Sequence, residues 1–156
     1  MSKFLKLVFS IAICQVIGII SGVATRESVT TWYQELTKPS FNPPNYIFAP
    51  VWIILYTLMG ISLFLIWKDG LDKNNSKFAF YFFIFHLVIN GLWSFVFFWW
   101  QSLMFSFFVI TILWIIIIII IYLFYKLNKL SSILLIPYLL WVSYASILNY
   151  YIWRLN

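Results

Sequence analysis

The chain has 156 residues, of which 64% are hydrophobic and 9% are charged. A soluble domain carries about 25% charged residues, so ten basic and four acidic side chains are too few to cover a water-soluble fold of this length. The mean hydropathy of +0.98 agrees, and an aromatic content of 23% excludes a disordered chain. The sequence therefore predicts an integral membrane protein and excludes a soluble globular enzyme.

Metal-binding and nucleic-acid-binding functions are also disfavoured. Cys14 and His86 are the only cysteine and histidine, and two such residues cannot supply a zinc or iron–sulfur ligand set. The pI is about 9.5, but the basic residues are scattered between apolar runs, as topology signals and interfacial anchors are. We therefore expect no metal site and no nucleic-acid partner.

Five segments are apolar and long enough to cross a bilayer, which takes about 20 residues. They are residues 4–24, 48–67, 78–100, 103–125 and 132–153. The polar pair Gln101-Ser102 divides a run that is too long for one helix. The first segment has the basic start of a signal peptide, but its apolar stretch exceeds the usual 7–15 residues or so, which favours a retained helix. The predicted fold class is an all-α integral membrane bundle of five transmembrane helices.

The distribution of basic residues predicts the orientation. Five spans place the N-terminus and the 68–77 and 126–131 loops on one side, where seven lysines lie: Lys3, Lys6, Lys68, Lys73, Lys77, Lys126 and Lys129. The other side holds three basic residues, Arg26, Lys38 and Arg154. Because cytoplasmic loops carry the excess of Lys and Arg, the N-terminus is expected in the cytoplasm.

The connection formed by residues 25–47 is the one loop with room for structure. Thr31 and Gln34 have capping-box spacing, which predicts a short helix, and Lys38-Pro39 should end it. The following stretch, SFNPPNYIFAP, is stiff and aromatic. It is too apolar to extend into water, so we expect it to fold back over the helix ends as a lid. The alternative is a simple interfacial belt of aromatic residues.

Polar side chains within the spans indicate a shared interior face, because lipid offers them no partner. His86, Asn90 and Ser94 recur at every fourth residue of the third span, and Trp141, Ala145 and Asn149 do so in the fifth. Trp52 and Tyr56 lie one turn apart in the second. These faces suit an aromatic, uncharged pocket for a flat apolar ligand. The alternative is that Asn90 and His86 only join helices through hydrogen bonds.

Acid–base catalysis has no support in the spans. The four carboxylates, Glu27, Glu35, Asp69 and Asp72, are all expected in loops, and a lone His86 cannot form a triad. A haem-ligand role for His86 is a minor alternative to a packed, hydrogen-bonded histidine. Hydrolase, transferase and ion-driven pump functions are therefore disfavoured.

Three motifs resemble the tryptophan-rich sensory protein/translocator protein family (TspO/MBR, the peripheral benzodiazepine receptor family). The segment WYQELTKPSFNPP covers Trp32 to Pro44, PVWIILYTLMG covers Pro50 to Gly60, and PYLLWVSYASILNYYIWRLN covers Pro137 to Asn156. The motifs occur in the family's order, and the resemblance extends over the whole chain with its five spans.

The resemblance implies a commonly dimeric five-helix bundle that binds protoporphyrin IX or a related tetrapyrrole under the first loop. It also implies binding of isoquinoline carboxamide and benzodiazepine ligands and of other apolar small molecules. Carried over by motif, the ligand-binding residues are Tyr33, Pro43, Trp52, Tyr56, Asn90, Trp93, Trp141, Ala145 and Leu148. The pattern Leu148, Tyr150, Arg154 fits one proposed for cholesterol contact.

Three functions follow from the resemblance. The first is a membrane sensory or stress-response protein that binds tetrapyrrole, and no cofactor is required for it. The second is a light- and oxygen-dependent enzyme that degrades porphyrin, with Trp52 and Trp141 positioning the macrocycle and carrying a radical. The third is a porphyrin or sterol transporter, which the absence of charge within the spans disfavours as a driven process. The Ile/Asn/Lys-rich chain further suggests a bacterial cytoplasmic membrane, or the outer membrane as for some relatives.

Overall fold

The computed structural model describes residues 1–72 and 74–156, and in this part of the chain every regular element is helical. Five helices are long and apolar enough to span a membrane, which confirms the predicted fold class. They are α1 (Lys3–Thr30), α3 (Phe48–Trp67), α4 (Asn74–Ser94), α5 (Leu103–Leu127) and α7 (Ile136–Leu155). Short helices stand between them or extend them: α2 (Trp32–Glu35), η1 (Asn45–Ile47), η2 (Phe95–Trp99) and α6 (Lys129–Ile133).

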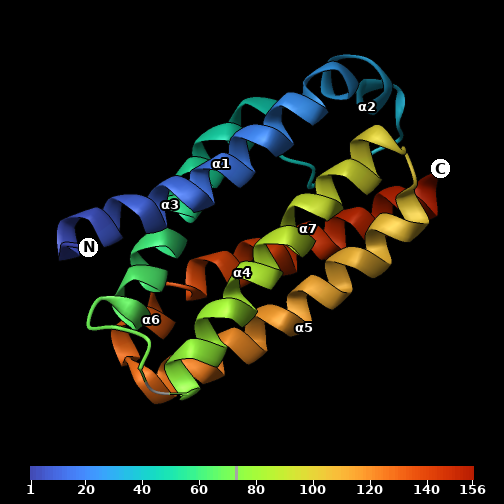
Figure 1. Ribbon diagram of the computed structural model, residues 1–156. Helices are drawn as coiled ribbons and strands as arrows, with labels where there is room; N and C mark the ends of the chain where they lie inside the picture. The colour runs from blue at the N-terminus through green and yellow to red at the C-terminus, as the bar shows by residue number, and fades with distance from the viewer. Residues whose placement is uncertain (73) are drawn as a thin grey trace.

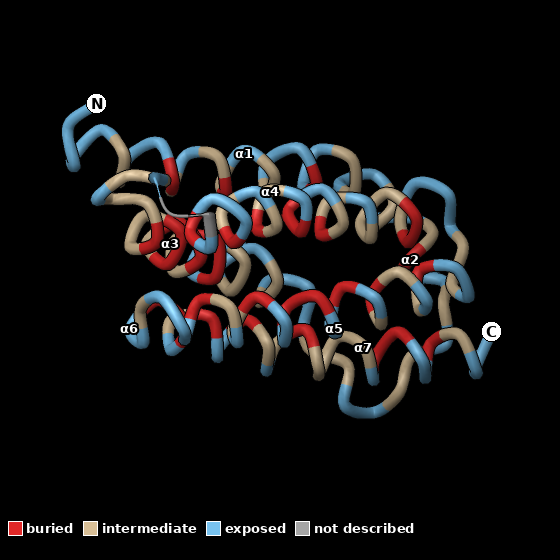
Figure 2. The backbone as a smooth tube through the Cα atoms, turned by 60° about the horizontal axis from the view of Figure 1, so that its bottom comes forward, coloured by how far each residue is buried: buried red, intermediate tan, exposed pale blue. Residues whose placement is uncertain are grey.

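The long helices run side by side in one bundle (Figure 1). Successive neighbours in it are α1, α3, α7, α5 and α4, with α4 returning to α1, and α4 also contacts α3. α1 packs most extensively against α3, α5 packs against both α4 and α7, and α3 meets α7 only narrowly. Buried positions face the middle of the bundle, and exposed positions face outward (Figure 2). Large apolar side chains such as those of Ile115 and Ile119 are exposed, as expected on a surface that contacts lipid rather than water.

The helix ends differ from the segments that hydropathy outlines. α1 continues past Ala24 to Thr30, so Arg26 and Glu27 lie in a helix rather than in the first loop. Hydropathy cannot register this extension, because these residues are polar yet still helical. The helix stops where the hydroxyls of Thr30 and Thr31 both donate to the Glu27 carbonyl oxygen, a local bond that competes with helix continuation.

The third and fifth spans are each made of two pieces. α4 passes into η2, a π-helical turn that is often associated with functional sites. Gln101 then adopts a left-handed φ of 52°, which produces the break expected at this residue. α6 and α7 are separate because Pro137, at the start of α7, lacks the N–H that would continue a helix through it.

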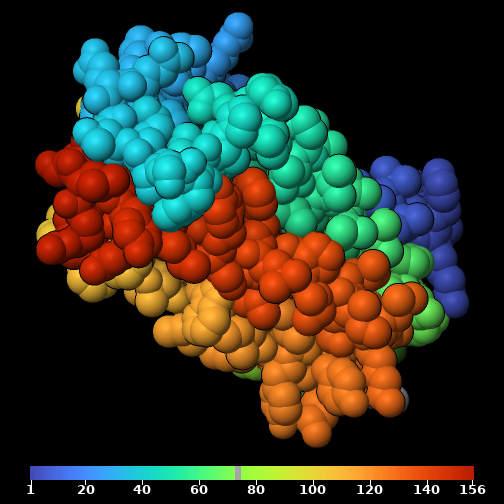
Figure 3. All heavy atoms as spheres, turned by 180° about the vertical axis from the view of Figure 1, so that it is seen from behind, coloured from blue at the N-terminus to red at the C-terminus, as the bar shows by residue number. Residues whose placement is uncertain are grey.

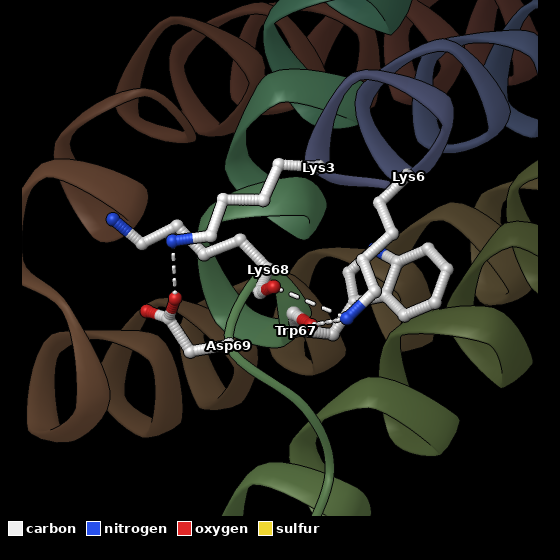
Figure 4. Close-up of polar contacts among 5 residues, drawn as sticks. All are labelled: Lys3, Lys6, Trp67, Lys68 and Asp69. Carbon is white, nitrogen blue, oxygen red and sulfur yellow. Dashed lines mark hydrogen bonds and ion pairs between the residues drawn. The ribbon is translucent and has the colours of Figure 1, made fainter. Parts of the chain in front are cut away.

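Lysines gather at the end of the bundle that holds the N-terminus and α6. Lys6 donates to the carbonyl oxygens of Trp67 and Lys68, both at 3.1 Å, so it caps the end of α3 (Figure 4). Lys3 and Asp69 form an exposed ion pair of 2.8 Å beside it, and this hydrogen bond from Lys3 is the main cause that lowers the pKa of Asp69 below its usual value. Lys73, also assigned to this side, lies outside the described residues.

Gly60 sets the separation of α1 and α3. A Cβ at Gly60 would lie 2.5 Å from the Ile11 Cα atom, whereas one at Gly22 would have no neighbour within 4 Å. The two glycines are therefore a matched pair, one at a helix crossing and one on an open face.

We expect Gly60→Ala to destabilise the protein by about 1–3 kcal/mol, because backbone atoms must separate to admit the methyl group. Gly22→Ala should be neutral or slightly stabilising, since alanine favours helix by about 1 kcal/mol over glycine. Thermal unfolding in detergent micelles measures both. Equal midpoints for the two variants would contradict the close crossing.

Candidate functional site

The first loop lies across the end of the bundle between α3 and α7 (Figure 3, light blue to cyan). Two main-chain contacts hold it to α7. The Tyr144 hydroxyl donates to the Phe41 carbonyl oxygen at 2.5 Å. The Asn156 side chain forms a reciprocal pair with Thr37, accepting from its N–H and donating to its carbonyl oxygen, each at 3.0 Å. The loop is thus an ordered element that is docked on α7.

Tyr33 anchors the start of this loop from α2. Its side chain is 3% exposed, its ring packs against those of Phe97 and Phe98, and its hydroxyl donates to Asn42 at 2.9 Å. Burial, as the largest cause, raises the pKa of Tyr33 to about 12. The hydroxyl therefore stays protonated and keeps this bond at all ordinary pH values.

The short helix expected after Thr31 is present, but the expected capping box is not. The Thr31 side chain makes no cap hydrogen bond to α2, because its hydroxyl donates back to Glu27 in α1. The Gln34 N–H instead reaches the Thr31 main-chain oxygen at 3.0 Å. α2 is therefore a turn stabilised by its docking on η2 rather than by its cap.

An aromatic seam runs along the narrow contact between α3 and α7. Phe48 meets Trp141 with ring centroids 6.0 Å apart, and one turn further along Trp52 meets Tyr138 at 6.2 Å. Toward the loop, Tyr144 contacts both Trp141 and Phe41. We call these residues the α3–α7 seam: Phe41, Phe48, Trp52, Tyr138, Trp141 and Tyr144. They offer flat apolar surfaces without any formal charge.

A chain of buried hydrogen bonds closes the inner end of the seam. The Tyr56 hydroxyl donates to the Asn90 Oδ1 atom at 2.5 Å, and the Asn90 Nδ2 atom donates to the Tyr138 oxygen at 2.9 Å. The His86 Nε2 atom lies 3.0 Å from the same oxygen, and its Nδ1 atom lies 2.9 Å from the Phe83 carbonyl oxygen. All four side chains in this chain, Tyr56, Asn90, Tyr138 and His86, are at most 4% exposed.

The donors and acceptors in this chain can be assigned without ambiguity. A carbonyl oxygen only accepts, so His86 carries its proton on Nδ1 and its Nε2 atom is free to accept from Tyr138. Each bond then runs in one direction, from Tyr56 through Asn90 and Tyr138 to His86 and Phe83. Every member is satisfied, as a polar group inside a membrane must be.

The structure brings most of the predicted ligand-binding residues into two adjoining groups. Trp52, Tyr56, Asn90, Trp141 and Ala145 line or adjoin the α3–α7 seam, whereas Tyr33 and Leu148 pack with Phe97 in a second cluster. Trp93 contacts both clusters, and its Nε1 atom donates to Asn149 at 3.0 Å. Pro43 lies in the loop, where its carbonyl oxygen accepts from Asn42.

The spacing of Asn90 and His86 allowed two interpretations, a ligand pocket or hydrogen bonds that only join helices. Both residues do form hydrogen bonds between helices. Asn90 joins α4 to both α3 and α7. This does not exclude a ligand beside them, because Trp52 and Trp141 stay only partly buried in the seam. Contact between a ligand and these residues remains a prediction.

The sterol-type pattern is divided between two faces of α7. Leu148 is buried in the core at 5% exposure, whereas Tyr150 is 40% exposed. Tyr150 lines an open groove of about 590 Å³ between α5 and α7, on the side away from α3. Leu148 therefore does not share a surface with Tyr150 and Arg154.

Two features of the site do not follow from the sequence patterns. Tyr138 is a central member of the buried chain, yet a tyrosine in an apolar span resembles an interfacial residue, and only its place after Pro137 in the third motif marks it. Gly18 also belongs to the site, because a Cβ there would lie 2.6 Å from the Tyr56 ring. Gly18 and Gly22 form a GxxxG pattern, and its first glycine allows the close approach of Tyr56 in the same chain.

We expect Asn90→Ala to destabilise the protein by about 1–3 kcal/mol, because it leaves the Tyr56 hydroxyl without its buried acceptor and removes one of the two partners of the Tyr138 hydroxyl. Asn45→Ala, which truncates an exposed asparagine, is the control and should leave the midpoint of thermal unfolding unchanged. Equal midpoints for Asn90→Ala and the wild type would show that the buried hydrogen bonds of Asn90 do not hold α3, α4 and α7 together.

Comparison with known proteins identifies the family. The family model described as TspO/MBR family matches residues 10–154. The tryptophan-rich protein TspO of Archaeoglobus fulgidus is 42% identical over 154 residues, which cover 99% of each chain. The tryptophan-rich sensory protein of Cereibacter sphaeroides is 32% identical over 80% of this chain and 77% of its own, and the Homo sapiens translocator protein is 30% identical over 80% and 75%. This chain, a multi-pass integral membrane protein, belongs to the TspO/MBR family.

Proposed function

We propose that this protein binds a tetrapyrrole such as protoporphyrin IX in the α3–α7 seam and acts as a membrane sensory protein of a stress response. The seam itself is the observation that carries the proposal. It places six aromatic side chains around an uncharged strip, and a flat macrocycle is the ligand class that gains most from stacking on such surfaces.

The charge distribution supports an apolar ligand body. The four carboxylates lie at the bundle ends, in the last turn of α1, in α2 and in the 68–72 segment, so none competes for the seam. Smaller flat ligands of the isoquinoline carboxamide and benzodiazepine type would use the same strip, and no further cofactor is needed. Asn90 and Tyr56 lie at its inner end, where their mutual hydrogen bond leaves an uncharged surface.

The first loop acts in this proposal as a lid. One hydrogen bond at Phe41 and two at Thr37 hold it to Tyr144 and Asn156. These bonds are exposed, and each contributes only about 0.5–1.5 kcal/mol. Such contacts hold the loop closed but allow it to open at little cost. Ligand entry would proceed by release of these contacts, with α2 kept in place by buried Tyr33.

We propose further that the protein resides in a bacterial cytoplasmic membrane with its N-terminus inside, and that it forms homodimers. Lys3 and Lys6 lie at the start of α1, Lys68 directly after α3, and Lys126 and Lys129 where α5 ends and α6 begins. These helix ends share one end of the bundle (Figure 1), in keeping with the positive-inside rule. A membrane-impermeant amine reagent should therefore label Lys126 and Lys129 only from the cytoplasmic face. Because Gly18 already contacts Tyr56, a dimer contact would lie elsewhere on the surface.

Binding is measured by quenching of tryptophan fluorescence with protoporphyrin IX in the dark. We expect saturable quenching that Trp141→Ala weakens, because this residue forms the middle of the seam. Asn156→Ala should raise the dissociation rate by up to about tenfold, the equivalent of 1.4 kcal/mol, through loss of both Thr37 bonds. Ser40→Ala, an exposed change in the same loop, is the control. Quenching that does not saturate would contradict the proposal.

A second candidate function is photo-oxidative degradation of the bound tetrapyrrole. The observation that favours it is the position of two oxidisable indoles, Trp52 and Trp141, which are both partly buried and both in the seam. The reaction needs no acid–base group, only an excited tetrapyrrole, oxygen and these side chains.

We expect Trp52→Phe and Trp141→Phe to retain porphyrin binding, since phenylalanine keeps a flat apolar surface, and to lose light-dependent turnover. Absorption spectra recorded during illumination in air measure the product. Trp153→Phe, which lies against Phe107 and Tyr150 outside the seam, should behave as the wild type. A product spectrum identical to that of free illuminated porphyrin would leave binding as the function.

A further inference from the structure

We propose that Tyr138 and His86 form a redox pair that reduces Trp52 after this tryptophan has been oxidised by a photoexcited tetrapyrrole. The inference rests on the proposed function in one respect, because it takes the bound tetrapyrrole as the natural oxidant of Trp52. The contacts that carry it, however, are all made between residues of this chain and can be tested without any ligand.

Trp52 contacts two tyrosines that are candidates to reduce it. Its ring is stacked on Tyr56 at 5.2 Å and meets Tyr138 edge-on at 6.2 Å. Both pairs of rings are close to van der Waals contact, so distance does not distinguish between them as electron donors. The difference between the two tyrosines lies in the group that receives the phenol proton.

An oxidised phenol is a strong acid, and its electron leaves readily only where a base takes the proton at the same time. The Tyr56 hydroxyl donates to the Asn90 amide oxygen, which is not basic. The Tyr138 hydroxyl donates to the His86 Nε2 atom at 3.0 Å, the lone pair of a neutral imidazole. The two acceptors, Asn90 and His86, are 3% and 1% exposed, so water cannot replace either of them. Tyr138 is therefore the donor that the geometry selects.

The steps balance as follows. The excited tetrapyrrole takes one electron from Trp52, which gives a tetrapyrrole radical anion and a tryptophan radical cation. Trp52 takes one electron from Tyr138, and the Tyr138 proton moves to the His86 Nε2 atom. The products are neutral Trp52, a neutral tyrosyl radical and an imidazolium cation. Return of the electron from the tetrapyrrole anion to Tyr138, with return of the proton from His86, restores the starting state.

The pair would move the oxidised site away from the ligand. Trp52 is partly exposed in the seam, where oxygen and the macrocycle would both reach it. Tyr138 is buried, and its hydroxyl is hydrogen-bonded to Asn90 and His86. The relay thus limits irreversible oxidation of Trp52 and lets the protein survive repeated illumination.

Electron paramagnetic resonance of the whole protein in lipid nanodiscs, frozen after illumination, tests the pair. One arm uses an ultraviolet flash that photo-ionises tryptophan without ligand, and the other uses visible light with protoporphyrin IX bound. Ring-deuterated tyrosine identifies a tyrosyl signal. Because His86 is the single histidine, ¹⁵N-histidine labelling reports on it alone, and the wild type itself should show coupling between this nitrogen and the tyrosyl radical.

Three variants complete the test. We expect the part of the tyrosyl signal that couples to the histidine nitrogen to vanish in Tyr138→Phe, and in His86→Gln, which keeps a hydrogen-bond acceptor but not a base. Tyr56→Phe should retain this signal in the ultraviolet arm. A wild-type tyrosyl radical without ¹⁵N coupling, or a signal lost with Tyr56 instead, would overturn the pair. A positive ultraviolet arm with no signal from saturably bound porphyrin would uphold the pair and reject the tetrapyrrole as its oxidant.

Discussion

The hydrogen-bonded chain from Tyr56 through Asn90 and Tyr138 to His86 is the constraint on which the arrangement of the bundle depends. Helices in a membrane gain no hydrophobic energy from contact with one another, so their positions depend on packing and on a few polar bonds. This chain joins α3, α4 and α7. It fixes the inner end of a helix contact that is otherwise narrow.

The two ends of the α3–α7 seam consequently differ in rigidity. The inner end is buried and satisfied, whereas the outer end is covered by a loop that a few exposed hydrogen bonds hold to α7. Regions that open locally are those with few buried contacts and solvent-exposed hydrogen bonds. A ligand that enters from the loop side would therefore meet a rigid inner end and a loop that can open. This arrangement is typical of a binding site and not of a continuous pore.

Composition and hydropathy were sufficient to predict the all-α fold and its five spans, because lipid permits few alternatives to apolar helices. The break at Gln101 was also predictable from its polarity. The polar continuation of α1 to Thr30 and the separation of α6 from α7 were not, since both depend on local hydrogen bonds and on Pro137. Within the site, spacing placed Trp52, Tyr56 and Asn90 on interior faces. It could not give their partners, because which tyrosine of α7 meets Asn90 depends on how two helices rotate against each other.

Mapping of photo-oxidation by mass spectrometry would test the seam as the binding site most directly. Bound protoporphyrin IX, illuminated in air, oxidises tryptophans near it, and the nine tryptophans of the chain report its position. A ligand in the seam predicts early, saturable oxidation of Trp141 in the wild type, and of Trp52 as well in Tyr138→Phe, which lacks the reductant of Trp52, although both tryptophans are partly buried. Trp99 and Trp100, which are 65% and 67% exposed, should react later. Oxidation that follows exposure, with Trp99 and Trp100 modified first, would contradict a tetrapyrrole site between α3 and α7.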